Sequence, residues 1–311
     1  MKCVRTAFAK RLADLAEKDA RIFALEGDLK ESTQSVIFEK AHPERYVECG
    51  IAEQNMVTVA AGMALAGKVP FCHSFAAFIS MRACEQVRTS VAYPKLNVKL
   101  VGTHAGLSAG SAGSTHHAIE DIAIMSAIPG MKVFAPGDAF EAAACADAMM
   151  SFDGPAYVRL GAAEYEPVFD ASYRMTVGKA VSVRDGNDCT IATTGSTLNL
   201  GIRAAELLKK EHGIDAGVLH FGTVKPLDAE AVRVALAKTG CIVTVEEHTV
   251  IGGFGAAVAQ VAACEWKGKV ISVGIEDRFP SVIGGMGYLW KHVGLTEKMI
   301  SETVSAALER R

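Results

Sequence analysis

The chain has 311 residues, half of them hydrophobic, and a formal net charge of −3 at pH 7. This length is comfortable for two domains with sizeable cores, and the mixed charge argues against a nucleic-acid or membrane partner. No apolar run approaches the ~20 residues that span a bilayer, and the N-terminus favours an amphipathic helix over a signal peptide, so a cytoplasmic location is expected. Eight cysteines stand singly without a CxxC pair, which favours free thiols over disulfides or a zinc site.

The first half of the sequence alternates helical and strand patterns. An amphipathic helix is predicted from Val4 to Leu15. Apolar runs predict strands at residues 21–25, 46–47, 69–72, 98–101, 132–135 and 156–160. Ala-rich or periodic segments predict helices at residues 56–65, 79–91, 119–127 and 139–150. Because strands alternate with helices, we expect a largely parallel sheet covered on both faces.

A second α/β pattern follows a break in this rhythm. The segment after residue 160 contains Glu164-Tyr165-Glu166-Pro167 and is typical of a linker. Strands are then predicted at residues 189–195, 216–220, 242–245 and 270–273, and helices at 198–210, 256–263 and 297–309. The prediction is an α/β protein of two domains, each a mostly parallel sheet flanked by helices. The first domain is expected at residues 1–165, the linker at 166–178 and the second domain at 179–311.

Glu53 is the most informative residue of the first half. It lies between the predicted strand at residues 46–47 and the predicted helix at 56–65. A carboxylate at such a junction is expected to be buried, which is costly unless it is protonated or partnered. One interpretation is an acid that favours the positive end of a helix dipole. If the partner is instead a heteroaromatic nitrogen, Glu53 is a proton switch for a cofactor.

A Gly/Ser-rich loop at residues 106–115 is a second candidate site. It follows a predicted strand, and His104 and His116 flank it. Ligands bind at the carboxyl ends of the strands in such sheets, although a flexible loop with incidental histidines has the same pattern. Phe75 and Phe78 also follow a predicted strand, where a planar ring could stack on them. The adjacent His116 and His117 diverge, which argues against a metal site.

These segments together resemble the C-terminal half of the transketolase family. Residues 50–56 (Gly-Ile-Ala-Glu-Gln-Asn-Met) resemble its pyrimidine-domain motif, and residues 74–78 resemble its aromatic segment. Residues 103–116 match its substrate loop, including the spacing of the two histidines. Glu246-Glu247-His248 and residues 252–255 resemble its C-terminal domain. The similarity extends over essentially the whole chain.

The resemblance implies thiamine diphosphate as the cofactor. By this similarity Glu53 hydrogen-bonds the pyrimidine ring. Phe78 stacks on that ring with Phe75 beside it, and Asp28 matches a cofactor-side position after the first strand.

The resemblance also implies a sugar-phosphate site. Four residues match its phosphate contacts, namely Arg5, Ser32, His104 and Arg159. His116 matches the histidine that contacts the substrate carbonyl and hydroxyl. His104 and His116 are thus the candidates for proton transfer, with Glu53 as the third catalytic residue.

Two residues depart from the family pattern near the reacting carbons. Ala112 stands where the family usually has an acidic residue that binds a substrate hydroxyl, and His117 stands where glutamine is usual. A hydroxyl left unpaired in the pocket costs roughly 1–3 kcal/mol. We therefore expect a substrate that differs from the usual pentulose phosphates.

The family's diphosphate and Mg²⁺ motif, Gly-Asp-Gly followed by Asn, is missing from this sequence. Since Mg²⁺ needs fixed oxygen ligands, we expect an N-terminal partner subunit to hold the metal and the diphosphate, in a two-plus-two heterotetramer. No metal ligand is expected in this chain. The predicted reaction is transfer of a two-carbon ketol unit from a ketose phosphate to an aldose acceptor.

Three other functions share parts of this pattern. The beta subunit of a 2-oxo acid dehydrogenase has the same two-domain plan. An enzyme similar to deoxyxylulose-phosphate synthase would start from pyruvate. A regulatory subunit without catalysis is the non-enzymatic alternative, and the presence of Glu53, Phe78 and the two histidines argues against it.

Overall fold

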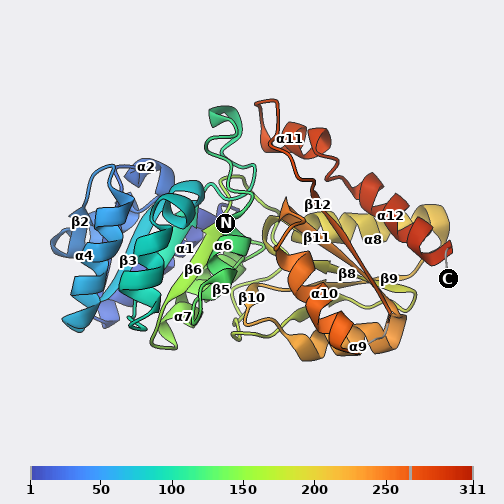
Figure 1. The fold of residues 1–311 in the computed structure, drawn as a ribbon, viewed down its shortest axis with the longest axis horizontal. Helices are drawn as coiled ribbons and strands as arrows, with labels where there is room; N and C mark the ends of the chain where they lie inside the picture. The colour runs from blue at the N-terminus through green and yellow to red at the C-terminus, as the bar shows by residue number, and fades with distance from the viewer. Residues whose placement is uncertain (1, 266–267, 310–311) are drawn as a thin grey trace.

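The computed structural model, which describes residues 2–265 and 268–309, has two β-sheets that follow one another along the long axis of the molecule (Figure 1). The first sheet has seven strands in the order β10-β5-β6-β4-β3-β1-β2, and the second has five in the order β12-β11-β8-β9-β7. All pairings are parallel except those of β10 with β5 and of β7 with β9. The predicted α/β class with two mostly parallel sheets is confirmed.

The strands of the first sheet are β1 (Ile22–Glu26), β2 (Tyr46–Glu48), β3 (Val69–Phe75), β4 (Lys99–Thr103), β5 (Lys132–Phe134), β6 (Ala156–Leu160) and β10 (Thr223–Lys225). Those of the second sheet are β7 (Val181–Arg184), β8 (Cys189–Thr193), β9 (Ala216–His220), β11 (Cys241–Thr249) and β12 (Lys269–Ile275). Strands β3, β4 and β6 are buried along nearly their whole length, which explains why their sequences are mostly apolar.

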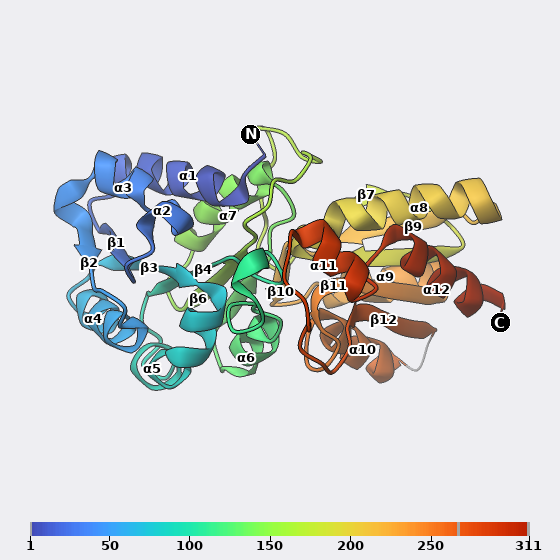
Figure 2. The same cartoon turned by 90° about the horizontal axis from the view of Figure 1, so that it is seen from above.

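Helices cover both faces of each sheet (Figure 2). Around the first sheet lie α1 (Val4–Lys18), α2 (Lys30–Thr33), α3 (Val36–Ala41), α4 (Glu53–Leu65), α5 (Cys84–Gln86), α6 (Asp121–Ala127) and α7 (Ala139–Met150). Around the second lie α8 (Leu198–His212), α9 (Ala229–Thr239), α10 (Phe254–Glu265), α11 (Met286–His292) and α12 (Glu297–Glu309). In the described residues, no helix is long and apolar enough to cross a membrane.

Short helical turns complete the chain, and two of them replace a predicted helix. The 3₁₀ turns are η1 (Pro43–Arg45), η4 (Gly110–Ala112) and η5 (Gly195–Thr197). The segment 79–91, predicted as one helix, consists instead of the π-helical turns η2 (Phe78–Arg82) and η3 (Val87–Ala92) on either side of α5. Such π-helical turns are frequent at functional sites.

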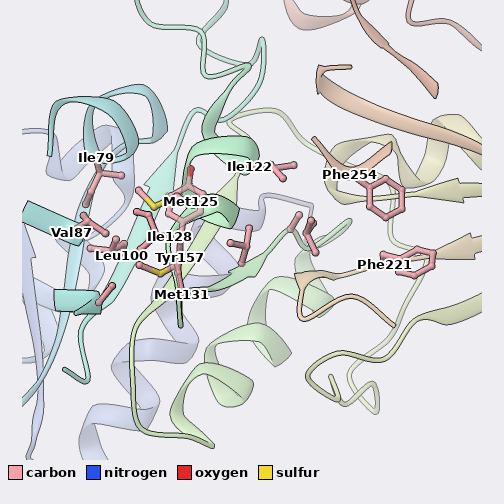
Figure 3. Close-up of a cluster of buried hydrophobic side chains, with 14 of the residues drawn as sticks. Ile79, Val87, Leu100, Ile122, Met125, Ile128, Met131, Tyr157, Phe221 and Phe254 are labelled. Atoms are coloured by element: carbon pink, nitrogen blue, oxygen red, sulfur yellow. The ribbon is translucent and has the colours of Figure 1, made fainter. Parts of the chain in front are cut away.

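The two halves of the chain share a hydrophobic core. Strand β10, which the sequence did not predict, comes from the second half but pairs with β5 at the edge of the first sheet. One cluster of buried side chains includes Met125 and Tyr157 from the first half and Phe221 and Phe254 from the second (Figure 3). The segment predicted as a linker is also anchored, because Asp138 Oδ2 accepts hydrogen bonds from the amides of residues 168 and 169.

Candidate functional site

Glu53 occupies the first position of α4, beside the end of β3. Its side chain is 1 % exposed. Ser74 Oγ donates a hydrogen bond to Oε1 over 3.0 Å, and Arg82 Nη1 donates to Oε2 over 2.6 Å. The carboxylate is therefore buried as predicted, and it has the partners that such burial requires.

Arg82 is a residue of this site that the sequence interpretation missed. Its guanidinium carbon lies 4.3 Å from the ring centroid of Phe78, within the range of a cation–π contact. The same guanidinium pairs with Glu53, so it joins the carboxylate to the aromatic segment. Nothing in the local sequence distinguishes Arg82 from other arginines, because its role depends on a contact with a residue 29 positions away.

Four rings lie together at the carboxyl ends of β3 and β4. Phe75 and Phe78 stack with centroids 5.7 Å apart. His104 lies 4.1 Å from Phe75, and His116 lies 5.2 Å from Phe78, both measured between ring centroids. The structure thus brings the aromatic pair and the two loop histidines into one cluster.

His104 is held in a strained and desolvated position. Its φ of +55° is in the left-handed region, which residues other than glycine rarely adopt. When such residues do occur, they are concentrated at functional sites. Thr103 Oγ1 lies 3.2 Å from Nδ1, and Arg5 Nη1 lies 3.4 Å from Nε2. Burial, followed by the charges of Arg5 and His116, lowers the pKa of His104 to about 4. Its imidazole is therefore neutral at neutral pH.

Arg5, Ser32 and His104 meet at the start of α1. Arg5 Nη1 donates to the carbonyl of Ser32, and Nη2 donates to the carbonyl of Ala162 over 2.9 Å. Arg5 Nε is buried and has no hydrogen-bond partner among the described residues. A guanidinium beside a histidine is suited to an anion such as a phosphate.

Arg159 and Asp28 do not join this cluster directly. Arg159 is buried on β6, with Nε 3.0 Å from Asp121 Oδ2 and Nη2 within 3.3 Å of the carbonyls of Ala118 and Glu247. Asp28 is exposed at the end of β1 with a φ of +63°. In the described part of the chain, no hydrogen bond links either side chain to another predicted site residue.

Glu247 anchors the histidine loop from the second half of the chain. Its Oε1 accepts hydrogen bonds from Leu107 N over 3.0 Å and from Trp290 Nε1 over 2.7 Å, and Oε2 accepts one from Ser196 Oγ over 2.6 Å. Burial raises the pKa of this carboxyl, while the donors act against that rise. The sequence around Glu247 resembles the family pattern, but its anchoring role depends on a contact between the two halves that local sequence does not reveal.

The two residues that depart from the family pattern lie in the same loop. Ala112 is the last residue of η4 and is exposed. His117 is 2 % exposed, and its Nε2 lies 3.3 Å from the carbonyl of Gly110. His117 Nδ1 is buried without a hydrogen-bond partner among the described residues, and burial lowers the pKa of this histidine.

Comparison with known proteins agrees with this geometry. Residues 2–167 match the family model described as the transketolase pyrimidine binding domain, and residues 178–300 match the transketolase C-terminal domain. Because these models together extend over most of the sequence, this chain belongs to the transketolase family.

Separately encoded subunits are among its relatives. The 6-deoxy-6-sulfo-D-fructose transketolase subunit of Clostridium sp. (strain MSTE9) is 41% identical over 99% of this chain and 95% of its own length. An apulose-4-phosphate transketolase subunit of Phocaeicola vulgatus is 37% identical over 97% of this chain and 96% of its own length. A solved structure, described as a split gene transketolase in an inactive beta4 tetramer, is 39% identical with a TM-score of 0.90, over 99% of this chain and 98% of that one.

Proposed function

We propose that this chain is the C-terminal subunit of a two-subunit, transketolase-like enzyme that moves a two-carbon ketol unit from a ketose phosphate to an aldose acceptor. The observation that carries the proposal is the position of Glu53. Its buried carboxylate is joined through Arg82 to Phe78, which packs against His116, at the carboxyl end of β3. An acid, a stacking surface and two imidazoles are the groups that such a reaction requires of the protein.

The residues present fit thiamine diphosphate, on which transketolases generally depend. Bound there, this cofactor supplies the carbon nucleophile that receives the ketol unit. Glu53 would hold a proton against a nitrogen of the pyrimidine, and Phe78, with Phe75 beside it, would provide the surface on which the ring stacks. Asp28 stays a predicted cofactor-side residue at the end of β1.

The substrate end of the site is assigned to the histidines and to Arg5. Since His104 is neutral near pH 7, it can accept a proton or a hydrogen bond from a substrate hydroxyl. His116 would orient the carbonyl and the reacting hydroxyl. Arg5 would bind the phosphate through its guanidinium, with Ser32 and His104 beside it. Arg159 stays a predicted phosphate contact, although its Nε donates a hydrogen bond to Asp121 in this structure.

A partner chain is proposed to bind Mg²⁺ and the cofactor's diphosphate in a two-plus-two heterotetramer. The sequence lacks Gly-Asp-Gly, and three related proteins are described as subunits or as split transketolases.

The decisive experiment reconstitutes this chain with its diphosphate-binding partner and assays donor cleavage, with ketose phosphates and with pyruvate. We expect turnover of a ketose phosphate only when both chains are present. Glu53→Gln should lower kcat of the pair by about 100-fold or more, because general acid–base catalysis contributes at least that much.

The exposed Glu85→Gln, on α5, is the matched control and should retain activity. Robust activity of this chain alone would overturn the partner requirement. Use of pyruvate in place of ketose phosphates would favour the dehydrogenase or synthase alternative, and full activity of Glu53→Gln would reject its catalytic role.

Ala112 leads to a prediction about the substrate. If a missing carboxylate explains altered recognition, Ala112→Asp should improve kcat/KM for xylulose 5-phosphate by about tenfold, the effect of one restored hydrogen bond. Ser111→Asp adds the same charge to the neighbouring residue and should not. If both variants raise kcat/KM equally, or if neither does, the carboxylate missing at residue 112 does not explain the choice of substrate.

A further inference from the structure

A cavity of about 320 Å³ lies at the edge of the first sheet opposite the histidine cluster. It is lined by η3, by the turn between α6 and β5 and by the residues that precede β6. These segments adjoin the amino ends of the strands, whereas His104 follows the carboxyl end of β4. The cavity is therefore separate from the site described above.

The floor of this cavity is apolar and one wall is an exposed aromatic ring. Ala92, Ile128 and Pro155 are buried lining residues, and Ile128 belongs to the core cluster of Figure 3. Tyr93 lines the same cavity yet is 87 % exposed. An exposed tyrosine beside a small apolar hollow is suited to contact the ring or alkyl body of a ligand.

Positive charge surrounds the hollow. Arg88, Lys95 and Lys132 line it, and the fully buried Lys99 donates a hydrogen bond to the carbonyl of the lining residue Gly154. In the described residues, none of these four cations forms an ion pair. The carboxylate among the lining residues is Asp153, which accepts a hydrogen bond from Asn97 Nδ2 over 2.9 Å.

Two of the cations share one aromatic ring. Lys132 Nζ lies 3.7 Å and Lys99 Nζ lies 4.0 Å from the ring centroid of Phe152. Lys99 also donates hydrogen bonds to the carbonyls of Phe152 and Gly154. These bonds hold the segment before β6 in place and explain why Lys99 is buried. Burial and the charge of Lys132 lower the pKa of Lys99 to about 7. This structural role of Lys99 does not require Arg88, Lys95 and Lys132 nearby. A bound anion would relieve the repulsion among these positive charges.

We propose that this cavity binds a small organic anion, with its apolar body against Tyr93 and Ile128 and its acidic group facing Lys132 and Arg88. A volume of about 320 Å³ is at the small end of ligand sites, which suits a single substituted ring or a short branched chain. The acidic group is a phosphate or a carboxylate, since both pair with this set of cations. Because the cavity is remote from the catalytic cluster, its ligand is a second ligand and not the sugar phosphate.

Calorimetric titration of the full-length chain with four probes tests this site. The probes are phenyl phosphate, phenylacetate, inorganic phosphate and benzyl alcohol, and all titrations use the Arg5→Gln background so that phosphate binding at the other site does not contribute. We expect one equivalent of phenyl phosphate or phenylacetate to bind, and the stronger of the two identifies the acidic group. Inorganic phosphate and benzyl alcohol should each bind at least tenfold more weakly, because each lacks one half of the ligand.

Adding Lys132→Gln should weaken binding of the aromatic anion about tenfold or more, the effect of losing one charge-assisted hydrogen bond. Lys10→Gln, an exposed lysine on α1, is the matched control and should change nothing. Arg88→Gln provides a second variant if Lys132→Gln lowers the melting temperature. Equal affinity for inorganic phosphate, equal affinity for benzyl alcohol, or unchanged binding in both lining variants would overturn the proposal.

Discussion

Arg82 contacts both of the groups that the proposed function assigns to a cofactor pyrimidine. Its guanidinium pairs with the carboxylate of Glu53 and covers the ring of Phe78. A guanidinium is planar and delocalised, so it can fill the place of a flat heteroaromatic ring. Binding of a pyrimidine between Glu53 and Phe78 then requires Arg82 to leave, and the 44 % exposure of its side chain leaves it room to do so.

Arg82→Met should therefore raise the affinity of this chain for thiamine diphosphate. We expect about a fivefold gain, because a half-exposed ion pair contributes up to about 1 kcal/mol. The affinity is measured by titrating the purified chain with thiamine diphosphate and Mg²⁺. Arg21→Met, which removes an exposed arginine that pairs with Asp19 ahead of β1, should leave the affinity unchanged. A weaker affinity in Arg82→Met would mean that Arg82 supports the cofactor site and does not obstruct it.

At the scale of elements, the position of the histidine loop depends on β11. Glu247 on β11 accepts a hydrogen bond from the amide of Leu107. A side chain at Gly106 would collide with the Glu247 carboxyl, because its Cβ would lie only 2.4 Å from the carboxyl carbon. Gly106 also has a φ of +64°, which favours glycine. The loop is thus shaped to pack on this one carboxylate.

Glu247→Gln should loosen the loop without unfolding the sheet. Glutamine removes the negative charge to which Leu107, Trp290 and Ser196 donate, and its amide nitrogen cannot accept the hydrogen bond of Ser196, so the loop contact is weakened by about 1–3 kcal/mol. We expect faster amide hydrogen exchange over residues 104–117 and a kcat/KM about tenfold lower in the reconstituted pair. Glu246→Gln is the neighbouring control, since Glu246 caps α10 through the amides of Phe254 and Gly255. If both variants change loop exchange equally, the effect is one of general stability.

Local sequence patterns predicted most elements of this fold, because buried strands and amphipathic helices have distinct periods. They also predicted the burial of Glu53 and the position of the two histidines at a strand end. They did not predict β10, whose three residues form a strand only because β5 offers an open edge. Arg82 and Glu247 were missed for a related reason, since each acts through partners far away in the sequence.

At the scale of the whole molecule, a buried histidine–carboxyl contact adds to the shared core. His220 Nε2 on β9 lies 2.8 Å from Glu141 Oε2 on α7, and both side chains are fully buried. Thr193 Oγ1 lies 3.0 Å from His220 Nδ1, and Tyr173 donates a hydrogen bond to Glu141 Oε1 over 3.1 Å. The contact network thus joins a helix of the first sheet to a strand of the second. The two sheets are expected to lose structure together.

His220→Ala should destabilise both halves of the chain. Removal of one partner leaves Glu141 buried without its imidazole, which costs about 3 kcal/mol. Urea unfolding followed by tryptophan fluorescence reports the second half, because both tryptophans lie beyond residue 260. Hydrogen exchange of β3 reports the first half. We expect both measurements to shift toward lower stability together, whereas the exposed His212→Ala on α8 should shift neither. A change confined to the second half would show that the two sheets unfold independently in spite of their common core.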